Sequence, residues 1–164
     1  RIMERLEMIV QSILVLLMAI HVTSACNCSM LTWEAAMCPA SNKTVVNATV
    51  CSVEFYDRQG RRVSSRNSAQ KGRYQMHLET IFKNGSNPLL EVYGDIFIMF
   101  PAKDVDCGYH LKAEKTYVLA GDVDKGGILT SSRCQMIIPF QDISNNTDVI
   151  SILQGERQLN CGSL

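Results

Sequence analysis

Alternation of apolar and polar residues predicts a chain made mostly of β-strands. Val46, Ala48 and Val50 fall on one face of a period-two pattern, as expected of a strand with one buried face. A later segment, 91–100, is apolar at most positions, so we expect it to be buried on both of its faces. The five strands predicted from these patterns are 45–55, 74–83, 91–100, 116–120 and 128–132.

The segments between these strands are polar. Residues 57–72 are rich in Arg, Ser, Gln and Gly, a composition typical of a solvated hairpin connection. Shorter turns are predicted at 84–88, which ends in Asn-Pro, and at 121–126, which begins and ends with glycine.

After Pro139 the period changes from two residues to that of a helix. Either Ser144 or Asn146 can serve as the N-cap of this helix. Its apolar positions are Val149, Ile150, Ile152 and Leu153. Five strands followed by a helix predict a mainly β domain, a five-stranded closed barrel of the OB type with flanking helices.

The first 25 residues have the pattern of a secretory signal peptide. A basic residue precedes an apolar run, 9–20, that is too short to span a bilayer. Thr23-Ser24-Ala25 then offers small residues for cleavage, which would make Cys26 the first residue of the mature chain. We therefore expect residues 1–25 to be removed, and residues 26–164 to form one secreted domain.

Charge and histidine content exclude several classes of function. The chain has 16 basic and 16 acidic residues with no block of Lys and Arg, so we expect neither nucleic acid nor a membrane as partner. Beyond residue 25 the only histidines are His77 and His110, and no HxxxH or CxxC spacing indicates a zinc site. Without a histidine-centred constellation, we expect no enzyme.

All seven cysteines lie beyond residue 25. In an oxidising compartment, paired structural disulfides are expected rather than a metal cluster. Because seven is odd, at least one thiol is left over or pairs between chains, and spacing alone leaves open which one. The cysteines are Cys26, Cys28, Cys38, Cys51, Cys107, Cys134 and Cys161.

Five N-glycosylation sequons also suit a secreted protein with exposed loops. They begin at Asn27, Asn42, Asn47, Asn84 and Asn145. We expect glycans at the last four only, because a disulfide-bound Cys28 would hinder modification of Asn27. Asn47 and Cys51 share a face of the first strand, so both are expected to point outward unless a bulge intervenes.

The cysteine pattern carries a resemblance. The spacing Cys26-x-Cys28, Cys38, Cys107-Gly108-Tyr109, Cys134 and Cys161 resembles the netrin-like N-terminal domain of tissue inhibitors of metalloproteinases, in particular the short single-domain members of invertebrates. Segments 117–121 and 127–129 are similar to the strand pair of that family. The resemblance implies the bridges Cys26–Cys107, Cys28–Cys134 and Cys38–Cys161, each stabilising the fold by about 4 kcal/mol. Cys51 then remains unpaired and available for a dimer.

The same resemblance implies a secreted inhibitor that needs no cofactor of its own. The α-amine and carbonyl oxygen of Cys26 would chelate the catalytic zinc of a secreted or cell-surface metalloproteinase. Asn27 would enter the S1′ pocket of that protease. The implied inhibitory edge consists of Cys26, Asn27, Cys28, Ser29, Met30, Val105 and Asp106.

Two positions depart from the family pattern. Asn27 stands where the family usually has Thr or Ser, and its amide would have to be desolvated in the pocket. Met30 stands where a proline is common, which leaves the edge less preset. These departures keep open an alternative, a secreted netrin-like binding or immunomodulatory module without protease inhibition. The position of Cys26 at the expected cleavage site favours the inhibitor.

Overall fold

The computed structural model describes residues 26, 28–85, 94–159 and 161. The expected signal peptide and Asn27 lie outside the described residues. The strands are β1 (Thr44–Tyr56), β2 (Arg62–Val63), β3 (Lys71–Lys83), β4 (Asp95–Pro101), β5 (Thr116–Val123), β6 (Leu129–Thr130) and β7 (Ile137–Pro139). The helices are α2 (Trp33–Met37), α3 (Phe140–Ile143) and α4 (Thr147–Leu153), with 3₁₀ turns η1 (Pro39–Ser41), η2 (Arg66–Ser68) and η3 (Asp104–Asp106).

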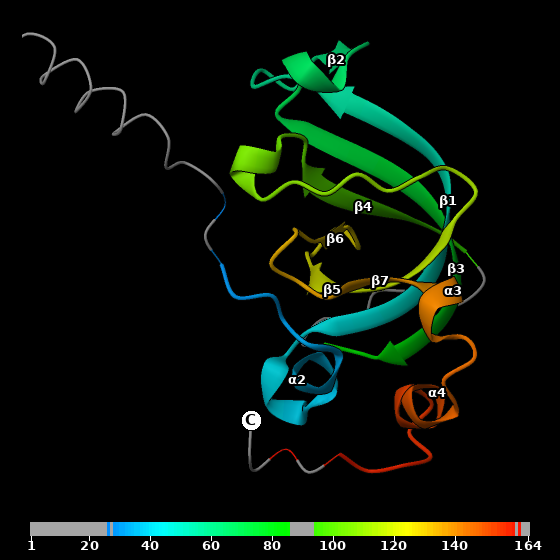
Figure 1. Cartoon of the computed structure of the whole chain (residues 1–164). Coiled ribbons are helices and arrows are strands. Elements are labelled where there is room, and N and C mark those ends of the chain that lie inside the picture. The colour runs from blue at the N-terminus through cyan, green and yellow to red at the C-terminus, as the bar shows by residue number, and fades with distance from the viewer. Residues whose placement is uncertain (1–25, 27, 86–93, 160, 162–164) are drawn as a thin grey trace, which may run out of the picture.

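Five of the strands close into a ring. The sheet order is β2-β1-β3-β4-β6-β5-β7, and β1 pairs with β5 as well as with β3 (Figure 1). All pairings are antiparallel except that of β4 with β6, which joins only two residue pairs. The predicted mainly β, OB-type barrel is therefore confirmed. Its ring is uneven, because β6 pairs with β4 and with β5 through only two residue pairs each.

The inside of the ring is the main hydrophobic core. Val46, Ala48 and Val50 of β1 all face it, as their alternation predicts. Tyr74 and Phe100 meet there edge to face, with ring centroids 5.7 Å apart, an arrangement that aromatic pairs favour. The strands thus bury their inner face completely.

Of the segment 91–100, which we expected to be buried on both faces, residues 91–93 lie outside the described residues and the rest is buried on one face only. In β4, Ile98 and Phe100 are buried, whereas Phe97 and Met99 on the opposite face are partly exposed. None of the described helices covers this outer face, so the prediction of two buried faces is wrong. The outer face of β4 is instead the floor of a groove described below.

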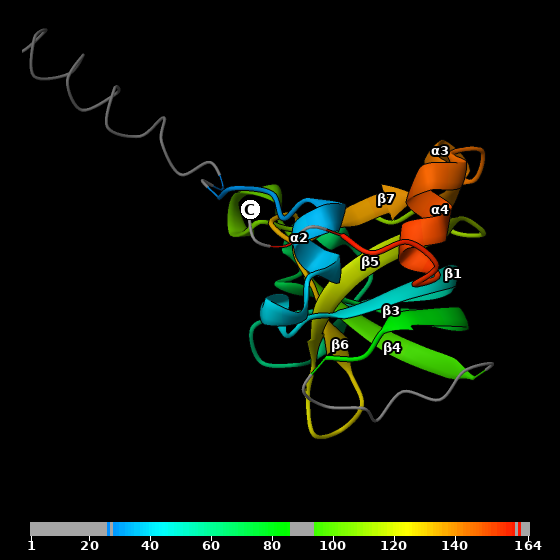
Figure 2. The same cartoon turned by 90° about the horizontal axis from the view of Figure 1, so that it is seen from below.

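A second core lies outside the ring, where the helices pack against β1, β5 and β7 (Figure 2). Val45, Val118 and Ala120 point outward from the barrel into this cluster and are fully buried. Ala36 of α2 and Leu153 of α4 meet them from the helical side. This second core anchors α2, the helix that follows the N-terminal segment.

Several boundaries differ from those predicted. β5 continues through the predicted turn at Gly121, where the backbone approaches β6 so closely that an added Cβ would lie 2.5 Å from the Thr130 carbonyl oxygen. β6 is shorter than predicted, and β2, β7 and α2 were not predicted. Asn146 is the N-cap of α4, since its Oδ1 accepts a hydrogen bond from Val149 N at 3.2 Å.

Lys83 ties the end of β3 to the end of α2. Its Nζ donates hydrogen bonds to the carbonyl oxygens of Ala36 (2.8 Å) and Cys38 (2.6 Å) and to Ser41 Oγ. Burial lowers the pKa of Lys83 from its ordinary value. The ammonium group thus satisfies carbonyls that the short helix leaves without intrahelical partners.

We expect Lys83→Met to lower the free energy of unfolding by about 2 kcal/mol, because the methionine keeps the stem and loses the charged hydrogen bonds. Urea denaturation measures this loss. Lys43→Met, which removes a more exposed ion pair with Asp122, is the matched control and is expected to cost less than about 1 kcal/mol. Equal losses in the two variants would contradict the anchoring role of Lys83.

Candidate functional site

The N-terminal segment is fastened to the barrel at three points within six residues. Cys26 is bonded to Cys107 and Cys28 to Cys134, with Cα–Cα distances of 5.0 and 5.7 Å. Leu31 N then donates a hydrogen bond to the Cys134 carbonyl oxygen at 2.9 Å. The segment is therefore held against the chain on both sides of its exposed residues.

A third bridge joins Cys38 to Cys161, with a Cα–Cα distance of 5.8 Å. The three bridges span 81, 106 and 123 residues, so each one closes a long loop. They are the pairs that the family resemblance implies. Because the first two converge on one end of the barrel, they fix the position of the N-terminal segment as well as stabilising the fold.

The two N-terminal bridges are packed together. Cys26 Sγ lies 3.5 Å from Cys28 Sγ and 3.6 Å from Cys134 Sγ, and all four sulfurs of the two bridges lie within 4.8 Å of one another. Metal ligation by cysteine needs thiolates. Since the four sulfurs are joined in disulfides, the cluster is a structural staple and not a metal site.

A second segment, η3, lies next to the N-terminal segment because Cys107 directly follows it. Arg66 holds η3 in place, donating from Nη2 to Asp104 Oδ1 at 2.9 Å and from Nε to the Ala102 carbonyl oxygen at 2.8 Å. Arg133 approaches the same carboxylate oxygen at 3.5 Å. Two arginines from distant parts of the chain thus brace the segment that carries Val105 and Asp106.

The turn that follows η3 requires a glycine. A Cβ at Gly108 would lie 2.3 Å from the Pro101 carbonyl oxygen and 2.6 Å from that of Lys103. Cys107, just before it, adopts a left-handed conformation with φ of 62°. This tight reversal brings Cys107 back to the N-terminal segment.

The predicted edge residues that the structure describes come together at this end of the barrel. Cys28, Ser29 and Met30 are exposed on one segment, and Asp106 is exposed on the other. Met30 is 60% exposed and is the one large hydrophobic side chain found exposed within the described ranges. Asn27 and the side chain of Val105 lie outside those ranges. Arg66 and Arg133 were missed because nothing in the sequence links them to Asp104.

Three of the expected glycan acceptors are exposed, and one is not. Asn42, Asn84 and Asn145 lie at the surface, whereas Asn47 is only 8% exposed. Asn47 is paired with Val118, which belongs to the core beneath the helices, so the outer face of β1 is covered here. The expectation that Asn47 points into solvent is therefore wrong, whereas glycosylation of the sequons stays a prediction.

Cys51 is an exposed free thiol. The pairing of β1 with β3 shifts register between Val50 and Ser52, so Cys51 is the extra residue of a β-bulge. The bulge accounts for its exposure although Asn47, on the same face by simple alternation, is buried.

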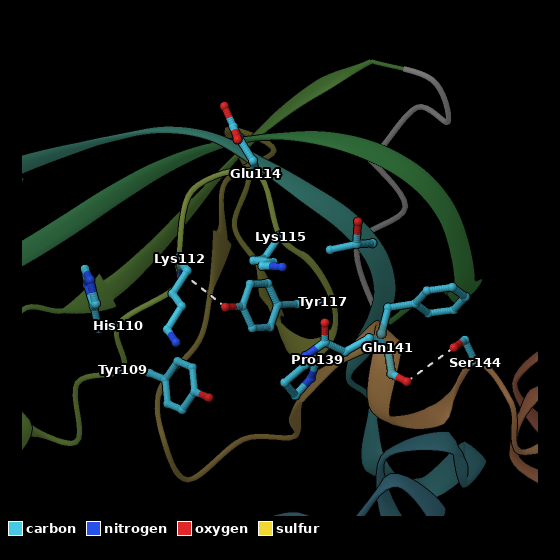
Figure 3. A pocket seen from close by; sticks show the side chains of 11 residues that line it. Tyr109, His110, Lys112, Glu114, Lys115, Tyr117, Pro139, Gln141 and Ser144 are labelled. Carbon is cyan, nitrogen blue, oxygen red and sulfur yellow. Dashed lines mark hydrogen bonds between the residues drawn. The ribbon is translucent and has the colours of Figure 1, made fainter.

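A separate pocket of about 470 Å³ lies between the 109–117 segment and the region of β7 and α3 (Figure 3). Tyr117 forms part of its wall, and the Tyr117 hydroxyl accepts a hydrogen bond from Lys112 N at 3.1 Å. Burial raises the pKa of Tyr109 at its edge. Lys112 and Lys115 are exposed here and serve below as control positions.

Comparison with known proteins identifies the family. A family model described as tissue inhibitor of metalloproteinase matches residues 24–161, which include all seven cysteines. No match is found among curated proteins. In the described part of the chain, no helix has the length and apolar character needed to cross a membrane. The chain belongs to the tissue inhibitor of metalloproteinase family, whose members are inhibitors of metalloproteinases and not enzymes.

Proposed function

We propose that the protein is a secreted inhibitor that uses the N-terminal Cys26 to chelate the catalytic zinc of a secreted or cell-surface metalloproteinase. The observation that carries this proposal is the double fastening of the N-terminal segment by Cys26–Cys107 and Cys28–Cys134. Cleavage after Ala25 would place a free α-amine on a residue whose side chain is already fixed to the barrel.

The inhibitor needs no cofactor of its own, because the zinc ion belongs to the target protease. A catalytic zinc has three protein ligands and an open position held by water. The amine and carbonyl oxygen of Cys26 together replace that water as a two-atom chelate. An α-amine has a pKa of about 8, so a neutral fraction exists near pH 7. Because the bridges pre-order the segment, little conformational entropy is lost on docking.

The direct test is inhibition of a panel of metalloproteinase catalytic domains by secreted protein whose N-terminus is confirmed as Cys26 by mass spectrometry. We expect stoichiometric inhibition of at least one zinc protease. Absence of inhibition across the panel would leave the netrin-like binding module as the better account.

Asn27→Thr is expected to tighten inhibition about fivefold, since an amide larger than the usual Thr or Ser must be desolvated in the S1′ pocket. The measurement is the inhibition constant for the best target in the panel. Asn27→Gln is the matched control, because it also removes the sequon but keeps the amide. Equal tightening by both variants would point to a glycan at Asn27 and contradict the pocket argument.

We also propose that the exposed Cys51 links two chains. A non-reducing gel of the secreted protein is expected to show a dimer band that disappears in Cys51→Ser. Thermal stability should stay nearly unchanged, because the Cys51 side chain is exposed. A pure monomer in both proteins would contradict the dimer.

A further inference from the structure

Two hollows on the outer face of β3 and β4 form one groove. They have volumes of about 600 and 430 Å³, within the usual range for ligand sites. The residues common to both are Gln70, Lys71, Met99 and Ile128. We call this the β3–β4 groove. It runs from the connection that follows β1 to Asp106 beside the N-terminal segment.

The strand register explains why the groove is open. Lys71 pairs with Pro101 and Arg73 pairs with Met99, and these residues point away from the core. Their neighbours Gly72 and Phe100 point inward and are buried. In OB-type barrels this face, flanked by the loops after the first strand and before the last, commonly binds extended polymers.

One end of the groove is cationic. Arg58 and Lys71 are exposed there, and the Arg73 guanidinium lies 3.7 Å above the centre of the Phe97 ring. This stacking holds the charge in place. Across the described residues, no salt bridge joins Arg58, Lys71 or Arg73 to a carboxylate.

The nearby acidic residues are engaged with other arginines. Asp57 binds Arg61 at 2.8 Å, and Glu54, which faces Arg73 across the β1–β3 pair, lies 3.2 Å from Arg62. Because Glu54 also interacts electrostatically with Arg73, the excess positive charge at this end comes from Arg58 and Lys71.

The rest of the groove has a different character. Met99 and Ile128 give both hollows apolar surface, and the second hollow adds Pro101 and the carboxylates of Asp106 and Asp124. A uniform polyanion that entered the second hollow would meet the carboxylate of Asp106. An extended polypeptide with an acidic residue followed by an apolar one matches the whole pattern.

We propose that the β3–β4 groove docks an extended segment of the bound metalloproteinase, with an acidic residue at the Arg58–Lys71 end and an apolar side chain over Met99. The inference rests on the proposed function. Asp106 belongs both to the groove and to the inhibitory edge, so a protease seated on the edge lies at the groove's opening. The groove thereby selects among proteases that share the same zinc chemistry.

The test is the double variant Arg58→Glu/Lys71→Glu against the matched control Lys112→Glu/Lys115→Glu, which has the same net charge. All four positions are exposed, so both proteins are expected to fold, as thermal denaturation checks. For the best target, the groove variant should raise the inhibition constant about tenfold at low salt, and less at high salt where the charges are screened. The control should stay within about twofold of the unaltered protein.

Three outcomes overturn the inference. If the groove variant inhibits as the control does, the groove is not a docking site, and the zinc-chelating function stands. If the groove variant loses only retention on a heparin column and keeps its inhibition constant, the surface binds polyanions instead. If the unaltered protein inhibits no metalloproteinase, the proposed function and the groove inference fail together.

Discussion

One alanine added in front of Cys26 is expected to weaken inhibition by at least about a hundredfold, equivalent to about 3 kcal/mol of binding free energy. The extra residue converts the α-amine of Cys26 into an amide, which is a poor zinc ligand, and it also occupies the space needed by the metal. Nothing in the described fold depends on that amine. The midpoint of thermal unfolding should therefore stay nearly unchanged.

Inhibition constants of the extended and unextended proteins for one protease measure the effect. Trimming the added alanine with an aminopeptidase provides the control, since it should restore inhibition in the same sample. Equal inhibition by the two forms would exclude zinc chelation by the Cys26 amine. Membership of the family would then be the only remaining support for an inhibitory function.

Removal of a single bridge is the second large effect, and it separates stability from function. Both Cys28→Ser/Cys134→Ser and Cys38→Ser/Cys161→Ser are expected to lower the free energy of unfolding by about 4 to 5 kcal/mol, because each opens a loop longer than 100 residues. Guanidinium denaturation measures both losses.

Inhibition should respond differently in the two variants. Loss of Cys28–Cys134 frees the exposed residues 28–30, so inhibition by the folded fraction should weaken at least about tenfold through the cost of ordering them. Loss of Cys38–Cys161 leaves the edge fastened, so inhibition should change little at temperatures where the protein is folded. Equal weakening would show that the edge depends on global stability and not on local restraint.

Long, regular patterns were read correctly from the sequence. The alternation of Val46, Ala48 and Val50 predicts the inner face of β1, and the helical spacing after Pro139 predicts α4, whose cap Asn146 was one of two candidates. Elements as short as β2, β7 and α2 escape such reading because two to five residues do not complete a recognisable period.

Other errors arose because burial depends on what covers a strand. The apolar run 91–100 suggested two buried faces, yet the outer face of β4 is left partly open. Asn47 looked like a surface position, yet its side of β1 lies under the helical layer. In both cases the deciding fact is tertiary, and local periodicity carries no information about it.

The candidate edge shows the same division. The family resemblance implied which cysteines are bonded and therefore which segments meet, since the two Cα atoms of a bridge lie within about 7 Å. The ion pair that holds η3 in place could not be predicted, because Arg66 and Asp104 are 38 positions apart in the sequence. A short polar contact of this kind has no signature until the chain is folded.

The interleaving of the three bridges has a consequence for cleaved forms of the protein. Cys26, Cys28 and Cys38 are all bonded to partners that come after residue 106. A protease that cuts once in the exposed connection after β1 would therefore produce two fragments joined by three covalent links. Such a nicked molecule should migrate as one species until a reductant is added, and it should keep its N-terminal segment in place. Limited proteolysis at that connection would then leave the two fragments bound to each other.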